Sequence, residues 1–404
     1  MKLISDKTSI TMTDGNPRFM PLNIPQMAAE TTSRTTILLL LVFTTCCTAP
    51  KQKEEIRIGL YAPLSGSTAS FGSQVKKGVE LAVDERNAAG GIDGTKIALF
   101  TEDDRGEAGE AQNAVTKLIT RDRVSAIIGE ATSSGSLAAA PVSQHYRIPM
   151  ITPTATNPRV TQIGDCIFRV CWLDTFQGEV IAKFAATRLN LKRVAVLYDI
   201  SSDYSVGLME VFSQSFSRQG GTMLQRKSYA AGDTDFSAQL TAIKADQPEG
   251  IYIPGYYSEV GLIARQVRKL GIEAILLGTD GWDAPELFEL GSGSLDGSYY
   301  VTHFYPGDPA PAVQSFVKKF QDRYRELPAL GSALGYDATR LMFEAIEKVG
   351  ISEPSRICEV LAQTSGFQGV TGSITMNADR NPIKPAVILG ITKDKAQFVE
   401  RSGG

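Results

Sequence analysis

The chain has 404 residues, 43% of them hydrophobic, and a formal net charge of −3 at pH 7. This length exceeds what a single hydrophobic core usually organises, so the sequence predicts two domains. The weakly acidic balance, without a basic block, argues against a nucleic-acid partner, and the Cys/His spacing typical of zinc sites is missing.

The N-terminal segment predicts export. Residues 1–26 show no hydrophobic periodicity, and we expect them either to precede the true start of translation, at Met27, or to be disordered. Ile37 to Phe43 is an unbroken apolar run. It is far shorter than the ~20 residues that span a bilayer, but it suits the core of a signal peptide. We therefore expect a signal peptide over residues 27–46.

Two adjacent cysteines, Cys46 and Cys47, follow this apolar run. A Cys directly after such a segment resembles a bacterial lipoprotein processing site, at which the Cys is acylated and becomes the new N-terminus. Either cysteine is a candidate for lipidation, and residues 47–54 would then form a polar tether at the outer face of the cytoplasmic membrane. The alternative is a plain secretory signal with two incidental cysteines.

Short apolar strands alternate with amphipathic helices along the rest of the chain. The first set comprises strands at 56–61, 97–101 and 124–128 and helices at 74–87, 108–120 and 136–146. The second set comprises strands at 194–198, 222–228, 250–253 and 274–277 and helices at 207–219, 236–245 and 259–270. Such alternation predicts parallel sheets with helices on both faces. Because it occurs twice, we expect an α/β fold with two doubly wound lobes.

Two apolar strands open into loops rich in Ser, Thr and Gly. One loop follows Ile128 and reads GEATSSGS, and the other follows Ile151 and reads TPTATNP. In open α/β sheets, ligands bind at the carboxyl ends of the strands, where such loops lie. Ser133 also precedes a predicted helix, whose N-terminus favours an anion. The two loops therefore predict a site for a small anionic group.

Eight segments occur in an order and at spacings typical of a known family. They are IGLYAPLSGSTASFG, AGGIDGTKIALFTEDD, IIGEATSSGS, ITPTATNPRVTQ, FRVCWLDTFQG, VAVLYDISSDYSVG, GIYIPGYYSEVGLIARQVRKLG and LLGTDGWD. On these segments the chain, from residue 55 to about residue 397, resembles the leucine/isoleucine/valine-binding proteins of bacterial ATP-binding-cassette importers, which have the type I periplasmic binding fold. The resemblance implies two lobes joined by a three-strand hinge, with the ligand in the cleft between the lobes.

The resemblance also implies where the lobes begin and end. The three crossovers between them should lie near Asp174, near His303 and around residues 381–384. Lobe 1 would then comprise residues 55–174 plus 304–382, and lobe 2 residues 175–303 plus 383–404.

Polar ligand contacts can be assigned to matching positions. The resemblance implies that Ser133, Thr154 and Thr156 hold the α-carboxylate and share in binding the ammonium group of an amino acid. It implies that Asp280, at the end of a strand in lobe 2, pairs with the ammonium group; this chain has Asp where the branched-chain binders carry Glu. The alternatives are helix and turn capping by the Ser and Thr residues and a turn role for Asp280.

Aromatic residues complete the implied site. Tyr204 and Tyr256 match tyrosines that line the pocket of the family, Phe71 stands where the branched-chain binders have a Tyr, and Trp282 follows the acidic turn. Pockets are mostly apolar with a few placed polar groups, which fits this composition. The alternative for each of the four is ordinary packing.

The resemblance predicts that the protein is the extracytoplasmic solute-binding component of an ATP-binding-cassette importer. It would bind an amino acid, branched-chain or related, by cleft closure, with a membrane permease as its partner and no cofactor or metal. The alternative is an amide or amino-acid sensor on the same fold without a transport partner. An enzyme is not expected, because a GxSxG elbow, a GxxxxGK[ST] loop and an HExxH helix are all missing.

Three further expectations concern reactive side chains. Cys166 and Cys171 lie five residues apart in an extended segment, which places their Cα atoms roughly 16 Å apart and beyond the reach of a disulfide. Because Cys358 has no obvious mate, we expect three reduced structural thiols. We also expect the acidic triplet at 102–104 to be a solvated loop edge rather than a metal or acid/base site, and His145 and His303 to lie at the surface.

Overall fold

A computed structural model of the chain describes residues 55–350 and 353–403. The predicted signal peptide and the two candidate lipidation sites, Cys46 and Cys47, lie outside the described residues. Within that part of the chain, every helix is too short or too polar to cross a membrane.

The first sheet has five parallel strands in the order β2-β1-β3-β4-β5. Its strands are β1 (Ile56–Ala62), β2 (Ile97–Asp103), β3 (Ala126–Ile128), β4 (Met150–Thr152) and β5 (Ile167–Arg169). The strand order reverses beside β1, because the chain moves from β1 outward to β2 and then returns to β3 on the other side. Such a switch point leaves a crevice at the carboxyl ends of the two central strands, where ligands bind.

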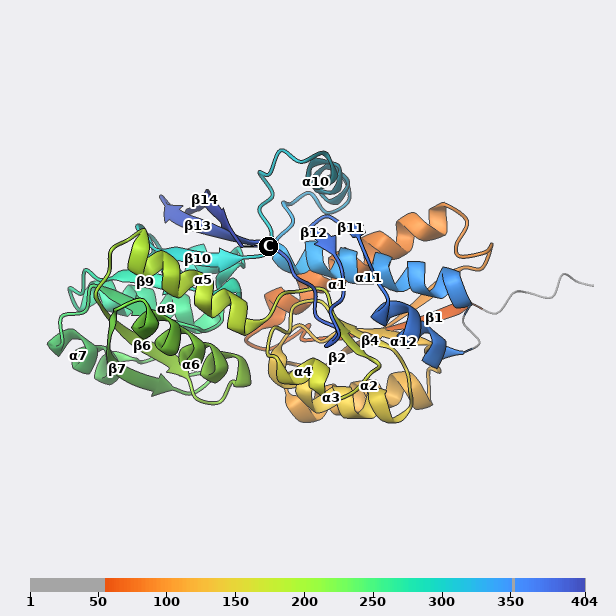
Figure 1. Cartoon of the computed structure of the whole chain (residues 1–404), viewed down its shortest axis with the longest axis horizontal. Coiled ribbons are helices and arrows are strands. Elements are labelled where there is room, and N and C mark those ends of the chain that lie inside the picture. The colour runs from red at the N-terminus through yellow and green to blue at the C-terminus, as the bar shows by residue number, and fades with distance from the viewer. Residues whose placement is uncertain (1–54, 351–352, 404) are drawn as a thin grey trace, which may run out of the picture. The chain divides into compact units, whose positions relative to one another are not determined.

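Helices cover both faces of the first sheet (Figure 1). On one face lie α1 (Ala69–Ala88), α11 (Leu330–Val349) and α12 (Pro354–Ala362). On the other lie α2 (Ala108–Thr120), α3 (Ser133–His145) and α4 (Arg159–Gln162). The helix α10 (Pro311–Tyr324) packs on α1 and α11, and a short hairpin of β11 (Phe367–Gly369) and β12 (Gly372–Ile374) follows α12. These elements are called lobe 1.

The second sheet has seven strands in the order β14-β13-β10-β9-β8-β6-β7. Its strands are β6 (Arg193–Asp199), β7 (Thr222–Tyr229), β8 (Gly250–Tyr252), β9 (Ile275–Gly278), β10 (Tyr299–Thr302), β13 (Ala386–Thr392) and β14 (Lys395–Ser402). The five from β6 to β10 are parallel, whereas β13 and β14 add an antiparallel edge. The order reverses beside β6, which places a second switch point between β6 and β8.

Helices also cover both faces of the second sheet. On one face lie α5 (Asp174–Thr187) and α6 (Asp203–Arg218), and on the other α7 (Ser237–Ala245), α8 (Tyr257–Lys269) and α9 (Glu286–Gly291). A single 3₁₀ turn, η1 (Asp280–Trp282), follows β9. These elements are called lobe 2. The predicted α/β fold with two doubly wound lobes is confirmed.

Three segments carry the chain between the two sheets. The first crossover (residues 170–173) joins β5 to α5, the second (303–310) joins β10 to α10, and the third (375–385) joins β12 to β13. The residue at which each lobe begins or ends stays a prediction, because these segments contact both lobes.

Four helices, α1, α3, α6 and α8, begin earlier than their hydrophobic pattern predicts, and local structure explains the shift for α3 and α1. The helix α3 begins at Ser133 rather than at residue 136, because the Thr132 side chain caps it by accepting a hydrogen bond from the Gly135 N–H (3.3 Å). The helix α1 begins at Ala69 rather than at residue 74. Its first turn packs so closely on the preceding loop that a Cβ at Gly72 would lie 1.9 Å from the Pro63 carbonyl oxygen.

The prediction of three reduced thiols is wrong. Cys166 and Cys358 form a disulfide across 192 residues of sequence, while Cys171 is free and buried. The pairing arises because the chain returns to lobe 1 after building most of lobe 2, and α12 then packs beside β5. Spacing along the sequence cannot reveal a contact that depends on this return.

Candidate functional site

A small cavity lies between the two switch points. In this structure it has room for about one water molecule. Lobe 1 and lobe 2 each contribute four lining residues, which are Phe71, Ala131, Thr154 and Leu330 from lobe 1 and Tyr204, Tyr256, Asp280 and Gly281 from lobe 2. The structure therefore brings five of the eight predicted ligand contacts together around one cavity.

Asp280 is the charged group of this cavity. It follows β9 as the first residue of η1, is 4% exposed, and accepts hydrogen bonds at Oδ1 from Tyr204 Oη (2.5 Å) and Gln177 Nε2 (3.1 Å). Burial raises its pKa to about 6 even though both hydrogen bonds favour the charged form. A cation placed in the cavity would stabilise the ionised carboxylate, so the arrangement is suited to an ammonium group.

Two more carboxyl groups, the buried Asp174 and the partly buried Asp283, lie near Asp280. Asp174, at the start of α5, accepts a hydrogen bond from Gln177 Nε2 (2.8 Å), and Asp283 accepts one from the Thr302 hydroxyl. Burial raises the pKa of each to about 7, and the charge of Asp280 adds to both shifts. Nevertheless, no group of three or more metal-ligating side chains is found within residues 55–350 and 353–403.

The polar rim of lobe 1 is formed by the loops after β3 and β4. Ser133 Oγ accepts a hydrogen bond from the Asn157 N–H (3.2 Å), and Thr154 Oγ1 donates one to the Ala131 carbonyl (2.6 Å). The buried Thr156 hydroxyl lies beside Asp174 without a well-formed hydrogen bond within the described part of the chain. Thr154 lines the cavity, whereas Ser133 and Thr156 do not.

Aromatic rings from both lobes meet at the cavity. Tyr204 and Tyr256 stack with ring centroids 5.1 Å apart, and Phe71 of lobe 1 contacts Tyr256 edge-on at 5.7 Å. Trp282 is placed elsewhere. It is fully buried in the core of lobe 2, where its indole N–H donates to the Ile253 carbonyl (3.0 Å), and it does not line the cavity.

Direct contacts join the lobes on both sides of the cavity. On one side the Ser70 N–H donates to Tyr257 Oη (3.1 Å) and the Ser70 hydroxyl to Glu286 (2.6 Å). On the other, Asp203 at the start of α6 accepts from Ser134 (3.3 Å) and forms an ion pair with Arg159 (3.1 Å). The two lobes are therefore closed over the cavity.

The geometry agrees with comparisons to known proteins. A family model described as periplasmic binding protein matches residues 55–396, most of the chain. The chain belongs to the periplasmic binding protein family. This family consists of binding proteins, which agrees with the expectation that the protein is not an enzyme.

Individual members of the periplasmic binding protein family resemble the chain over most of their length. The Leu/Ile/Val-binding protein homolog 3 of Brucella melitensis is 32% identical over 80% of this chain and 87% of the relative. The crystal structure of the leucine-binding protein LivK from Thermotoga maritima is 38% identical, covers 86% of this chain and 99% of its own, and superposes with a TM-score of 0.83. The structure of LivJ from Streptococcus pneumoniae in complex with isoleucine is 34% identical and superposes with a TM-score of 0.83. The match covers 87% of this chain and 100% of the LivJ chain.

Two residues beside the site of this periplasmic binding protein are absent from the sequence prediction. Gln177 orients Asp280, and its position three residues after Asp174 on a helix is the signal that pairs the amide with that carboxyl. Glu130 lies beneath the start of α3, where its carboxylate accepts from the Thr132 N–H (2.6 Å) and hydroxyl (2.5 Å). Burial, and then the charge of Asp104, raise the pKa of Glu130 well above its ordinary value.

Two expectations about charged side chains are wrong. Asp104 is fully buried rather than part of a solvated loop edge, because it turns inward beside Glu130. His303 is 4% exposed rather than at the surface, because the second crossover runs through the interior between the lobes. His145 is exposed, as expected.

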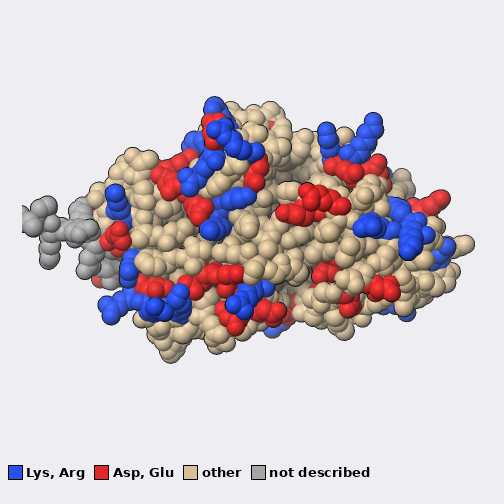
Figure 2. Space-filling view, turned by 180° about the vertical axis from the view of Figure 1, so that it is seen from behind, with Lys and Arg blue, Asp and Glu red and all other residues tan. Residues whose placement is uncertain are grey.

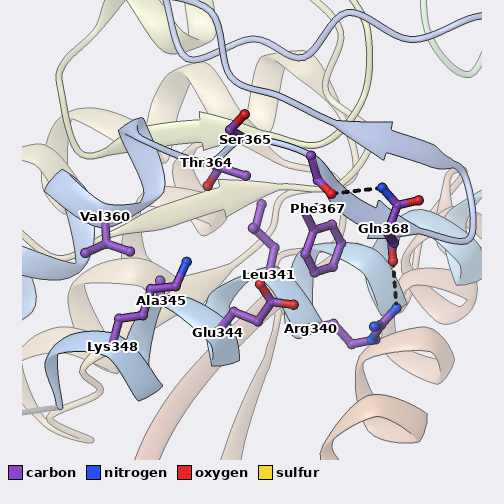
Figure 3. A pocket seen from close by; sticks show the side chains of 11 residues that line it. Arg340, Leu341, Glu344, Ala345, Lys348, Val360, Thr364, Ser365, Phe367 and Gln368 are labelled. Atoms are coloured by element: carbon purple, nitrogen blue, oxygen red, sulfur yellow. Dashed lines mark hydrogen bonds between the residues drawn. The ribbon is translucent and has the colours of Figure 1, made fainter.

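Outside the cleft, lobe 1 carries a groove between α11, α12 and β11 (Figure 3). Arg340 donates to the Gln368 carbonyl (3.2 Å) across one end of it, and Glu344 and Lys348 line the floor. None of the predicted ligand contacts lies in this groove. Figure 2 shows acidic and basic side chains interspersed over one face of the molecule.

Proposed function

We propose that the protein is the extracytoplasmic solute-binding component of an ATP-binding-cassette importer, and that it holds an amino acid with an aliphatic side chain in the cavity between its lobes. The observation that carries this proposal is the position of Asp280. Its carboxyl group is buried, is oriented by Tyr204 and Gln177, and lines a cavity whose lobe 1 wall is apolar except for Thr154.

Each part of an amino acid has a matching group in the proposed complex. The ammonium group pairs with Asp280, because a buried carboxylate gains most from a cation in contact. The carboxylate lies toward Thr154 and the start of α3, with Ser133 and Thr156 supporting these loops or contacting the ligand after small shifts. The aliphatic side chain packs against Phe71, Leu330 and Tyr256.

The cavity and the ligands of similar proteins favour a small molecule. With the lobes closed the cavity has room for about one water molecule, so a ligand enters when the lobes move apart and the lining side chains make room for it. The similar LivJ protein has isoleucine bound, and the similar LivK protein is named for leucine. We propose L-leucine, L-isoleucine and L-valine as the first ligands to test.

We further propose that the protein acts outside the cytoplasm and is anchored by a lipid on Cys46 or Cys47. The disulfide between Cys166 and Cys358 supports the extracytoplasmic location, because such bonds persist in oxidising compartments. Mass spectrometry of protein from membranes tests the anchor. The expected result is a lipidated N-terminal Cys, and an unmodified mature N-terminus would contradict it.

A thermal-shift screen tests the ligand class. The branched-chain amino acids should raise the melting temperature, since a ligand at a hundredfold excess over its dissociation constant stabilises the folded state by about 2.7 kcal/mol. D-leucine, 4-methylpentanoate and isoamylamine are matched controls for chirality, the ammonium group and the carboxylate. Stabilisation by 4-methylpentanoate equal to that by L-leucine would contradict the proposed role of Asp280.

A further inference from the structure

The three crossovers of the hinge meet directly behind Asp280. His303, the first residue of the second crossover, lies with its Nε2 3.3 Å from Asp280 Oδ2. Its ring stacks on Trp172 of the first crossover, with centroids 3.5 Å apart and planes at 19°. The face of the ring thus contacts one crossover while its edge contacts the carboxyl group of the proposed ligand site.

A buried lysine connects the third crossover to the first. Lys384 is 2% exposed and donates from Nζ to the Val170 carbonyl of the first crossover (3.0 Å). It also donates to the Thr371 hydroxyl, which in turn donates to Asp337 of α11 (2.6 Å). The hinge segments are therefore joined to one another by polar contacts and ring stacking.

His303 contacts Asp280 through the Nε2 edge of its ring. Tyr204 and Gln177 both donate to Oδ1 of Asp280, and His303 supplies the contact to Oδ2. Burial, and then the charge of Lys384, lower the pKa of His303 well below its ordinary value, so the ring is neutral. A neutral imidazole next to an ionised carboxylate donates from Nε2, and Nδ1 is then left without a hydrogen bond within the described residues.

We propose that His303 is a positioning residue that couples the charge on Asp280 to the hinge, so that a bound ammonium group favours the closed arrangement of the lobes. This inference rests on the proposed function. The hydrogen bond from His303 is strongest when Asp280 is ionised, which is the state that the ligand ammonium stabilises. Rotation of the crossovers during opening moves the imidazole relative to Trp172 or Asp280, and the ligand-bound state resists that movement.

Stopped-flow fluorescence with L-leucine tests this coupling. The chain has two tryptophans, and Trp172 stacks on His303, so closure should change the emission. His303→Leu removes the donor and His303→Asn cannot reach the Nε2 position, so both should raise the dissociation rate about tenfold with the association rate within threefold of wild type. His303→Gln places an amide near the Nε2 position and should restore the dissociation rate to within threefold.

A variant at a neighbouring residue distinguishes an effect of His303 on the hinge from a general loss of core packing. Val301 is fully buried on β10, two residues before His303, and Val301→Ala should lower the melting temperature without changing either rate. Unchanged dissociation in the folded His303→Leu and His303→Asn variants would overturn the inference, as would equal losses in His303→Gln and His303→Asn. A wild-type protein that does not bind L-leucine would overturn the proposed function itself, which calorimetry on the wild type establishes first.

Discussion

Within residues 55–350 and 353–403, the buried carboxyl group of Asp280 forms no ion pair with a Lys or Arg side chain. Its contacts come from the hydroxyl of Tyr204, the amide of Gln177 and the neutral ring of His303. Taking an ionised carboxylate out of water costs several kcal/mol unless a charge of opposite sign compensates for it. In the proposed complex the ligand supplies that charge, which explains why the closed lobes favour the loaded state.

Replacing Asp280 with Asn should weaken the binding of L-leucine by about 2–5 kcal/mol, because the ligand ammonium is left desolvated without its counter-charge. Isothermal titration calorimetry measures this loss. Asp283→Asn is the control, since Asp283 lies nearby, is partly buried and has a raised pKa, but does not line the cavity. The affinity of this variant should stay within a few-fold of wild type. Equal affinities of the Asp280→Asn variant and wild type would contradict the role of Asp280.

The affinity should also depend on pH. Burial raises the pKa of Asp280 in the free folded protein to about 6, and the ligand binds the ionised form, so binding releases a proton below that pH. The dissociation constant should rise by up to about tenfold per pH unit as the pH falls below 6, and should be flat from pH 7 to 8. Titrations in buffers of different ionisation enthalpy detect the released proton, and tighter binding at pH 5 than at pH 7 would contradict the account.

Burial of the same carboxyl groups affects the stability of the free protein. The pKa values of Asp174, Asp280 and Asp283 in the folded state, about 7, 6 and 7, lie above their ordinary values. Their contribution to stability is therefore complete below pH ~4 and is lost as the pH rises through 6 to 7. The ligand offsets the part of this loss that belongs to Asp280.

The role of a residue could be predicted from the sequence only where the neighbouring residues determine its position. Asp280 and Thr154 follow strands and reach the cavity, as the loop pattern indicates. Trp282 also follows a strand, but its size and its indole N–H are accommodated by the core of lobe 2, and no local pattern distinguishes these two environments. The burial of His303 could not be predicted, because its neighbours in sequence do not reveal that the other two crossovers lie close to it.

At the scale of helices and strands, hydrophobic periodicity predicts the parallel core well. The predicted helix at 108–120 agrees with α2, and the predicted strand at 222–228 falls short of β7 by one residue. Periodicity fails at helix starts, where capping decides. Thr132 starts α3 three residues before the pattern indicates, and this shift places Ser133 inside the helix rather than before it.

The disulfide joins two elements that lie far apart in sequence. Cys166 precedes β5 at the amino end of the first sheet, and Cys358 lies on α12. Replacing both with Ala should lower the free energy of unfolding by about 2–5 kcal/mol, since the bond closes a long loop in the unfolded chain. Denaturant unfolding followed by circular dichroism measures this change.

Ligand affinity provides the control for the disulfide variant. The cavity lies at the carboxyl ends of the strands, away from Cys166, so L-leucine should bind the variant within threefold of wild type. An unfolding free energy equal to that of wild type would contradict the bond, as would two free thiols at these positions in the native protein.

At the scale of the whole molecule, two similar α/β lobes bring their switch points face to face. One wall of the cavity comes from the loops after β3 and β4 and from the first turns of α1 and α11. The other comes from the segments that follow β6, β8 and β9. The sequence predicts both lobes because the alternation of strands and helices occurs twice. Contacts between the lobes, such as Ser70 with Glu286 and Ser134 with Asp203, join residues that no local pattern connects.

A crystal structure of the protein with L-leucine tests the central claim most directly. The account predicts an amino acid in the cavity between the lobes, with its ammonium nitrogen within hydrogen-bonding distance of Asp280 and its carboxylate toward Thr154 and the start of α3. A ligand bound outside this cavity, or one whose carboxylate instead of its ammonium group faces Asp280, would contradict it.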